Sequence, residues 1–307
     1  MNAYVLTGAQ TTLVDAGIHD PARGPEESWS TLRKAVEMCD VDPHAIERLI
    51  VTHPHADHYG MAARFVDETG AELWMHADVG RELSSYEDPT ARAARLRDAL
   101  GKGSAEELDG LVSGDDWRPY ISGIAQPSHR VRDQDRFVAG EREWTVIHTP
   151  GHSRSHVCLW SETDAVLVSG DHLLGSITPH VDAGPEPEDP LGDYMTSLER
   201  VEKLAARLVL PGHGRPFEGG AERARATLRH HDRRLGAIVQ VVRHRPRALD
   251  EIAGEIFGAD LSESERRLAL GEVLAHLDYL ERRGEVDRFR RDDEKLAWRK
   301  LHRGAGR

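Results

Sequence analysis

Cysteine is scarce in this sequence. Its 307 residues include only two, Cys39 and Cys158, and these form no Cys-x-x-Cys pair. Two thiols are too few for the disulfide framework of a small secreted protein, and their scarcity favours a reducing compartment. The first residues also lack the basic and apolar segments of a signal peptide. We therefore predict a cytoplasmic protein.

Long apolar runs and an excess of positive charge are missing as well. No run of 18 apolar residues occurs, so we expect no membrane-spanning helix and no membrane partner. Lys and Arg total 40 against 53 Asp and Glu, and the formal net charge is −13. This balance excludes a protein that coats nucleic acid or anionic lipid with its whole surface.

The length and the apolar pattern predict two domains. Over residues 1–220, short apolar runs alternate with helical patterns, which is typical of an α/β layered domain. The predicted strands are Tyr4–Leu6, Thr12–Val14, Leu49–Val51, Glu72–Met75, Trp144–Ile147, Val157–Trp160, Val166–Val168 and Leu208–Leu210. The predicted helices are Tyr59–Glu68 and Asp193–Ala206. The polar residues 78–125 predict a helical cap insertion, and the proline-rich residues 175–192 predict a loop.

Residues 221–307 predict the second domain. They carry a net charge of +4, whereas residues 1–220 carry −17. A long helix is followed by helices at Ala248–Phe257 and Glu263–Arg283, and then by strand-like pieces around Val286–Phe289 and Leu296–Trp298. Three helices and a hairpin are the order of a winged-helix domain. The apolar stripe of the long helix is Ala224, Leu228, Leu235, Ile238, Val239 and Val242.

Metal-competent side chains follow four of the predicted strands. Residues 52–58 read Thr-His-Pro-His-Ala-Asp-His, and three later strands end at His152, Asp171 and His213. Imidazoles and carboxylates are costly to bury unpaired, so core packing does not explain them. Strand ends of a layered α/β domain can converge on one crevice. The seven candidate metal ligands are His53, His55, Asp57, His58, His152, Asp171 and His213.

This set of ligands predicts a dinuclear metal centre. Five imidazoles and two carboxylates suit Zn²⁺, with Mn²⁺ or Fe²⁺ as alternatives. Seven ligands exceed the four that a structural zinc ion needs, so a structural site is the weaker interpretation. Two divalent ions about 3.5–4 Å apart make hydroxide available at neutral pH and polarise a carbonyl or phosphoryl oxygen. The expected reaction class is hydrolysis.

The ordered set resembles the signature of the metallo-β-lactamase superfamily, H-x-H-x-D-H followed by a later His, a bridging Asp and a last His. The resemblance covers about residues 1–220 and implies a four-layer αββα sandwich. It implies that His53, His55 and His152 bind a first ion, that Asp57, His58 and His213 bind a second, and that Asp171 bridges them.

Single residues in the motifs indicate which branches of the superfamily this sequence resembles. Asp171 stands where some β-lactamases have Cys or Ser, which speaks against β-lactam hydrolysis. Leu174 stands where lactonases have Tyr, so lactone hydrolysis loses support. The segments 149–152 and 211–214 resemble the glyoxalase II side of the superfamily. Residues 221–307 resemble the winged-helix extension of the β-lactamase-like protein 2 group, some of whose members are endoribonucleases.

Five residues near the motifs have open roles. Asp15 either orients a ligand histidine or stabilises a turn. His148 and His156 are expected to pack or to hold ligands rather than to bind metal. His172 and His180 are expected to be solvated loop histidines, with protonation of a leaving group as the alternative role.

The leading hypothesis is a dinuclear metal-dependent hydrolase of a small ester or thioester. A metal-bridging hydroxide is expected to attack the carbonyl, and Asp57 is the predicted catalytic residue that holds and orients it while binding the second ion. The pocket walls are expected to come from residues 78–125 and 175–192. Whether the protein forms a homo-oligomer is left open.

Two other functions are carried as alternatives. The first is an endoribonuclease of the same fold that cleaves single-stranded RNA and holds it with the basic residues of the hairpin. These residues are Arg288, Arg290, Arg291, Lys295, Arg299 and Lys300, with acidic residues interleaved among them. The second is a DNA-binding regulator that keeps a vestigial hydrolase domain.

Overall fold

The structure is a computed structural model that describes residues 1–84, 86, 90–101, 116–184 and 188–301. The chain forms two compact units. The first comprises Met1–Glu87, Trp117–Pro179 and Thr196–Arg225, and the second comprises Asp88–Asp116, His180–Met195 and Ala226–Arg307. The second unit therefore contains two segments from within the chain, Asp88–Asp116 and His180–Met195, besides the C-terminal region. Among the described residues, no helix has the length and apolar character needed to cross a membrane.

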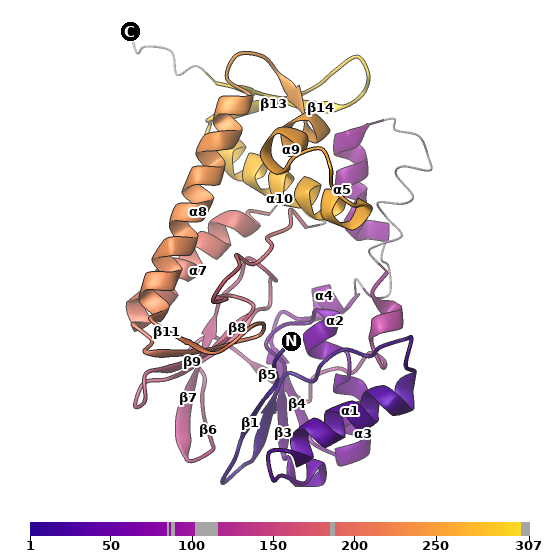
Figure 1. Ribbon diagram of the computed structural model, residues 1–307, viewed down its shortest axis with the longest axis vertical. Coiled ribbons are helices and arrows are strands. Elements are labelled where there is room, and N and C mark those ends of the chain that lie inside the picture. The colour runs from indigo at the N-terminus through magenta and orange to yellow at the C-terminus, as the bar shows by residue number, and fades with distance from the viewer. Residues whose placement is uncertain (85, 87–89, 102–115, 185–187, 302–307) are drawn as a thin grey trace. The chain divides into compact units, whose positions relative to one another are not determined.

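The first unit contains two β-sheets (Figure 1). The first sheet has the order β1 (Tyr4–Leu6), β2 (Thr12–Val14), β3 (Arg48–Ile50), β4 (Glu72–His76) and β5 (His129–Val131). The second sheet has the order β11 (Phe217–Glu218), β10 (Leu208–Pro211), β9 (Val166–Gly170), β8 (Val157–Ser161), β7 (Arg142–His148) and β6 (Arg136–Ala139). Strands β2 to β5 are parallel, and so are β9 and β10. Parallel strands bring their carboxyl ends to one edge of a sheet.

The described residues also form helices. They are α1 (Pro25–Glu37), η1 (Pro43–Ala45), α2 (Ala56–Tyr59), α3 (Ala62–Thr69), α4 (Gly80–Ser84), α5 (Thr90–Leu100), η2 (Arg118–Tyr120), α7 (Pro190–Leu204), α8 (Gly220–Val241), α9 (Leu249–Phe257) and α10 (Glu263–Arg282).

Side chains that alternate along the strands build the layers of the first unit. On β2, Leu13 packs in one core with Phe65 of α3, whereas Val14 packs in a second core with Val146 of the second sheet. Successive strand residues point to opposite faces, so the first sheet meets helices on one face and the second sheet on the other. Helix α7 contacts the second sheet, where Arg200 donates to the carbonyl oxygen of His148 on β7 at 3.0 Å, and Leu198 of α7 is fully buried. The layers are helix, sheet, sheet and helix, as the αββα prediction requires.

The predicted helix at Tyr59–Glu68 differs in the structure, where α2 and α3 are separate helices. The break lies at Gly60. A Cβ atom at this position would lie 2.3 Å from the Ala56 carbonyl oxygen and 2.7 Å from that of Tyr120. The chain turns there because Gly60 lets these backbone segments approach closely.

The cap predicted at 78–125 is divided between the two units. Helix α4 and η2 belong to the first unit, and α5 belongs to the second, where it packs on α9, α10 and β14 (Leu296–Lys300). Residues 85, 87–89 and 102–115 of the predicted cap lie outside the described residues. The described part of the predicted loop 175–192 is irregular until α7 begins at Pro190.

The second unit combines helices with a small sheet. Its sheet has the order β12 (Arg247–Ala248), β14 and β13 (Val286–Arg290). Leu249 of α9, Leu274 of α10 and Trp298 of β14 are almost completely buried and form part of its core. The order of three helices and a hairpin agrees with the sequence-based expectation, and the winged-helix identity stays a prediction.

Candidate metal centre

The structure brings all seven predicted ligands together in the first unit. His53, His55, Asp57 and His58 lie between β3 and α3, His152 lies in the β7–β8 loop, and Asp171 and His213 follow β9 and β10. Their ligand atoms form two groups, and within each group all atoms lie within 4.8 Å of one another. One group is His53, His55 and His152, and the other is Asp57, His58, Asp171 and His213.

The first group is a cluster of three imidazole nitrogens. His53 Nε2 lies 3.0 Å from His55 Nδ1 and 3.3 Å from His152 Nε2. Ligand atoms about 2.1 Å from a zinc ion at tetrahedral angles lie about 3.4 Å apart, so these distances fit one shared ion. His53 is almost completely buried, and burial, together with the neighbouring histidines, holds its pKa well below the usual value. The neutral imidazole is the form that binds metal.

The second group joins two carboxylates with two imidazoles. His213 Nε2 lies 2.9 Å from Asp57 Oδ2 and 3.4 Å from Asp171 Oδ2, and His58 Nε2 lies 3.3 Å from Asp171 Oδ1. Burial would raise the pKa of Asp57, but the hydrogen bond with His213 and the nearby histidines lower it to about 2. Asp57 is therefore a carboxylate at neutral pH, which is again the form that binds metal.

Asp171 contacts both groups. Besides its contacts in the second group, its Oδ2 atom lies 3.7 Å from His152 Nε2 of the first. His58 Nε2 and Asp171 Oδ1 are buried and make no hydrogen bond among the described residues. A buried imidazole nitrogen and a buried carboxylate oxygen left without a hydrogen bond are costly, and divalent ions held by the two side chains would remove that cost. The donor set therefore fits two divalent ions with Asp171 between them.

Asp15 sets the orientation of two ligand histidines. Its Oδ2 atom accepts a hydrogen bond from His58 Nδ1 at 2.7 Å, which leaves Nε2 of that ring for the metal. Thr52 donates its hydroxyl to the Asp15 carboxylate at 3.0 Å, and the same hydroxyl oxygen lies 3.1 Å from His53 Nδ1. Of the two roles left open for Asp15, the contacts support that of holding ligand histidines.

The charge of Asp15 also acts on His58. Burial opposes protonation of this ring, but Asp15 and Asp171 outweigh burial and raise the pKa of His58 to about 10. Binding of an ion at His58 Nε2 therefore displaces a proton, so metal binding and proton release are linked.

His156 holds the backbone of Asp171 in place. Its Nε2 atom accepts a hydrogen bond from the Asp171 backbone N–H at 3.1 Å, and its Nδ1 atom lies 2.8 Å from the Thr149 hydroxyl. Two glycines allow this packing. A Cβ at Gly170 would lie 2.7 Å from His156 Nε2, and one at Gly212 would lie 2.3 Å from Asp171 Oδ1.

The exposure of the ligands shows where the centre opens. The side chains of Asp57 and His213 are each 34% exposed, whereas those of His58 and Asp171 are 0% and 11% exposed. The interior of the centre is therefore closed by protein. Asp57 and His213 therefore form the more exposed edge of the second group.

The expectation of solvated histidines at 172 and 180 is wrong. His172 is fully buried because the turn after β9 packs inward, and burial lowers its pKa to about 3. His180 lies in the second unit, half-buried in an ion pair 3.6 Å from Glu272. His148, expected to pack, stacks on His76 with ring centroids 3.9 Å apart.

Two supporting residues were not found from the sequence. Thr52 precedes the histidine motif directly, and its place after β3 and before the four candidate ligands of that motif is a local signal. Glu82 of α4 accepts hydrogen bonds from the Ser153 hydroxyl at 2.7 Å and from two backbone N–H groups of the His152 loop. Because Glu82 lies 70 residues from His152 in the sequence, no local pattern marks it.

Comparisons with known proteins agree with this geometry. The family model of the metallo-beta-lactamase superfamily matches residues 2–213, and the model described as "Metallo-beta-lactamase-like, C-terminal domain" matches residues 235–301. A solved structure described as a beta-lactamase domain protein from Burkholderia ambifaria is 30% identical, with a TM-score of 0.82 over 97% of this chain and 87% of that chain.

Three curated relatives are similar along most of the chain. "Probable metallo-hydrolase YqjP" of Bacillus subtilis is 26% identical over 91% of this chain and 86% of its own length. A "Beta-lactamase-like protein 2 homolog" of Caenorhabditis elegans is 27% identical over 93% and 80%. "Acyl-coenzyme A thioesterase MBLAC2" of Gallus gallus is 28% identical over 72% and 74%. The chain belongs to the metallo-β-lactamase superfamily, and a metallo-β-lactamase-like C-terminal domain follows, in the sequence, the fold that holds its candidate metal centre.

Proposed function

We propose that the protein is a metal-dependent hydrolase that cleaves a small thioester, and more slowly an oxygen ester, at its carbonyl. The observation that carries the proposal is the pair of ligand groups joined by Asp171, with Asp57 and His213 at the open edge. The proposed ions are two Zn²⁺, with Mn²⁺ or Fe²⁺ as alternatives, because imidazole and carboxylate ligands accept all three. When bound, such ions supply a water-derived nucleophile at neutral pH and polarise the carbonyl oxygen.

Asp57 is the proposed catalytic residue. Its carboxylate stands at the open edge, where Oδ2 is held 2.9 Å from His213 Nε2. A carboxylate fixed in this way can accept a hydrogen bond from the attacking water and orient it toward a carbonyl that arrives from the solvent side. This role depends on the ionised form of Asp57, and its pKa of about 2 keeps it ionised.

Preference for a thioester follows from the leaving group. A thiolate with a conjugate-acid pKa of about 8.5 can depart near neutral pH without being protonated, whereas an alkoxide needs an acid. His172, the ring next to Asp171 that was considered for that acid, is fully buried and cannot reach a substrate. The similarity to an acyl-coenzyme A thioesterase of Gallus gallus supports the same substrate class.

RNA hydrolysis is the second candidate, and the charges of the hairpin speak against it. Basic side chains of this region form ion pairs with acidic ones of the same unit. The pairs are Arg288–Glu281, Arg290–Asp98, Arg291–Asp293, Lys295–Asp250 and Arg299–Asp287. Guanidinium groups engaged in this way offer less net charge to phosphates. RNA, a homo-oligomer and a cytoplasmic location stay predictions from the sequence.

The test is a parallel assay of three proteins loaded with zinc or manganese. These are the wild type, Asp57→Ala, and Asp67→Ala, in which an exposed aspartate of α3 away from the centre is replaced. Each is offered an S-acyl thioester, the matching oxygen ester and a single-stranded RNA. We expect the wild type and Asp67→Ala to hydrolyse the thioester, and Asp57→Ala to be about 100- to 10,000-fold slower with an unchanged melting temperature.

Three other results of this assay would contradict the proposed function or the proposed role of Asp57. Equal turnover by Asp57→Ala would remove the catalytic role of this residue. Cleavage of RNA that falls steeply with salt, without thioester turnover, would establish the endoribonuclease instead. A footprint on duplex DNA without any turnover would favour a regulator.

A further inference from the structure

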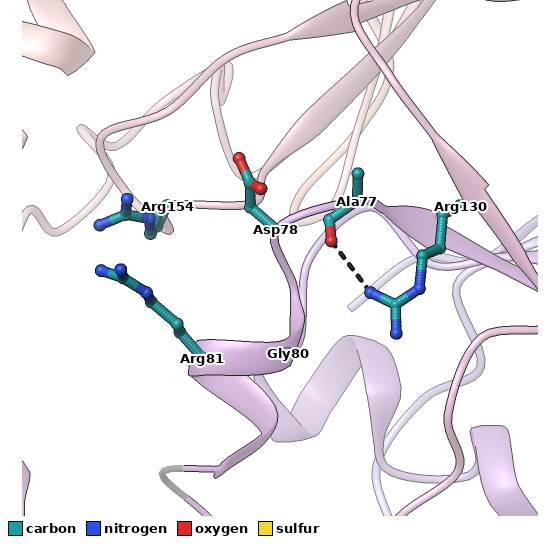
Figure 2. A pocket seen from close by; sticks show the side chains of 6 residues that line it. All are labelled: Ala77, Asp78, Gly80, Arg81, Arg130 and Arg154. Carbon is teal, nitrogen blue, oxygen red and sulfur yellow. Dashed lines mark hydrogen bonds between the residues drawn. The ribbon is translucent and has the colours of Figure 1, made fainter.

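A pocket of about 280 Å³ lies in the first unit, separate from the seven metal ligands. Its lining is Ala77, Asp78, Gly80, Arg81, Arg130 and Arg154 (Figure 2). Three of these six residues carry a guanidinium group and one carries a carboxylate. The pocket is therefore positively charged in a chain whose formal net charge is −13.

Separate elements bring the three arginines together. Arg81 lies on α4, Arg130 follows the first residue of β5, and Arg154 lies in the loop between β7 and β8. Figure 2 shows the side chains of Arg81 and Arg154 directed to the same side, and Arg130 beyond the turn at Ala77–Gly80. The Arg130 side chain is held there because its Nη1 atom donates to the Ala77 carbonyl at 3.0 Å.

Hydrogen bonds tie the backbone of Arg154 to helix α4, which carries Arg81. Glu82, the neighbour of Arg81 on α4, accepts from the Arg154 backbone N–H at 3.0 Å and from that of Ser155 at 2.8 Å. The Arg154 carbonyl oxygen lies 2.9 Å from His148 Nε2. The positions from which Arg81 and Arg154 extend are therefore set before any ligand arrives, which lowers the entropy cost of binding.

The chemistry of the lining selects an anion with several oxygens. Guanidinium groups that face one cavity repel each other, and an anion among them converts repulsion into attraction. The planar fork of arginine matches the oxygens of phosphate or carboxylate, and a phosphate dianion has enough charge and acceptor atoms for more than one arginine. Asp78 adds one negative charge, so the lining carries three positive side chains and one negative side chain.

The pocket lies close to the candidate metal centre along the chain. Arg154 follows His152 by two residues, and two residues span at most about 7 Å. The backbone positions of Arg154 and of the candidate ligand His152 are therefore close enough for one substrate to extend from the centre to Arg154. The lining offers only Ala77 and Gly80 as apolar residues, so it suits a polar group rather than an acyl chain.

We propose that Arg81, Arg130 and Arg154 form a subsite for a phosphate group on the thiol half of a thioester substrate. The proposal rests on the proposed function and names its substrate class, a thioester of a phosphorylated thiol. The acyl half then faces away from this pocket, and the phosphate anchors the thiol half while the carbonyl lies at the metal centre.

The test compares thioesters and thiols with and without phosphate. The probes are acetyl-coenzyme A and S-acetylpantetheine for turnover, and coenzyme A, pantetheine and inorganic phosphate for calorimetric binding. The proteins are the metal-loaded wild type, Arg81→Gln, Arg130→Gln and the double variant with Arg81 and Arg154 replaced by Gln. Arg33→Gln is the matched control, because it removes an exposed arginine of α1 whose nearest acidic partner lies 3.8 Å away.

We expect each single substitution to lower the ratio of kcat/KM for acetyl-coenzyme A over S-acetylpantetheine about tenfold, mainly through KM, and the double variant to lower it about 100-fold. A substitution that impairs the metal centre lowers kcat/KM for both thioesters, so it leaves their ratio unchanged. Coenzyme A is expected to bind the wild type more tightly than pantetheine does, with the difference lost in the double variant and kept in Arg33→Gln.

The binding arm separates this proposal from the proposed function. If neither thioester is hydrolysed but coenzyme A binds through the arginines, the subsite stands and the thioesterase function fails. If both thioesters are hydrolysed with the same ratio in the double variant and in Arg33→Gln, the subsite is refuted while the function stands. Arginine-dependent binding of inorganic phosphate without tighter binding of coenzyme A would overturn the assignment to a substrate.

Discussion

Replacement of Asp15 by Asn is expected to weaken metal binding about 10- to 100-fold, which corresponds to about 1.4–2.8 kcal/mol. The carboxylate accepts from His58 Nδ1 at 2.7 Å and from the Thr52 backbone N–H at 2.7 Å. In the variant, the amide oxygen can keep the Thr52 contact, and the amide NH₂ group then faces His58 Nδ1. This contact favours the tautomer with its proton on Nε2, which cannot bind metal.

The substitution changes charge without changing the backbone. Asp15 has a φ of +63°, a conformation that Asn tolerates about as well as Asp and that Ala does not. The side chain is only 3% exposed, so its negative charge acts on the centre with little screening by solvent. That charge favours a doubly charged ion more than the single proton it competes with at His58.

The assay is a zinc titration of metal-depleted protein against a fluorescent chelator, with both binding steps resolved. Asp15→Asn is expected to weaken mainly the step that involves His58. Thr52→Val is the comparison, because it removes the hydroxyl 3.1 Å from His53 Nδ1 and leaves the Asp15–His58 contact. Wild-type affinity in both steps for Asp15→Asn, with an unchanged melting temperature of the metal-free protein, would refute the reasoning.

Two further substitutions test the packing and the charges. Gly212→Ala places a Cβ 2.3 Å from Asp171 Oδ1 and 2.6 Å from His58 Cε1, so we expect fewer bound ions by mass spectrometry and a loss of about 1–3 kcal/mol of stability; wild-type metal content would contradict this. Burial would raise the pKa of Glu272, but its contact with His180 and the charge of Arg234 lower it to about 2. The neighbouring carboxylates outweigh burial and raise the pKa of His180 to about 9. The pair therefore stabilises the fold fully between about pH 4.5 and 6.5 and less toward pH 2 or above pH 9. Thermal unfolding of the wild type and Glu272→Gln across this range should differ most in that window, and a difference independent of pH would count against the ion pair.

The sequence predicted which candidate ligands lie together because they follow the ends of apolar strands. His152, Asp171 and His213 are more than 90 residues from His53, yet strand ends in a layered sheet arrangement bring them together. The short strands β5 and β6 were missed. Strand β5 has three residues of which only Val131 is apolar, and β6 has four residues that begin with Arg136, so neither forms a long apolar run.

Contacts between distant segments explain the other differences. Gly60 ends α2 because the backbones of Gly17 and Tyr120 approach it, and neither lies near it in the sequence. His172 follows a strand in a polar-looking turn, but the turn packs into the core and buries the ring. Such packing depends on the whole fold, so local composition does not reveal it.

The two ligand groups become complete at different points of the chain. The first needs residues up to His152, whereas the second also needs His213, which is 61 residues further on. At about 5–20 residues per second, a ribosome adds those residues in about 3–12 s. During synthesis, the chain therefore contains all three histidines of the first group before His213 of the second group has been added.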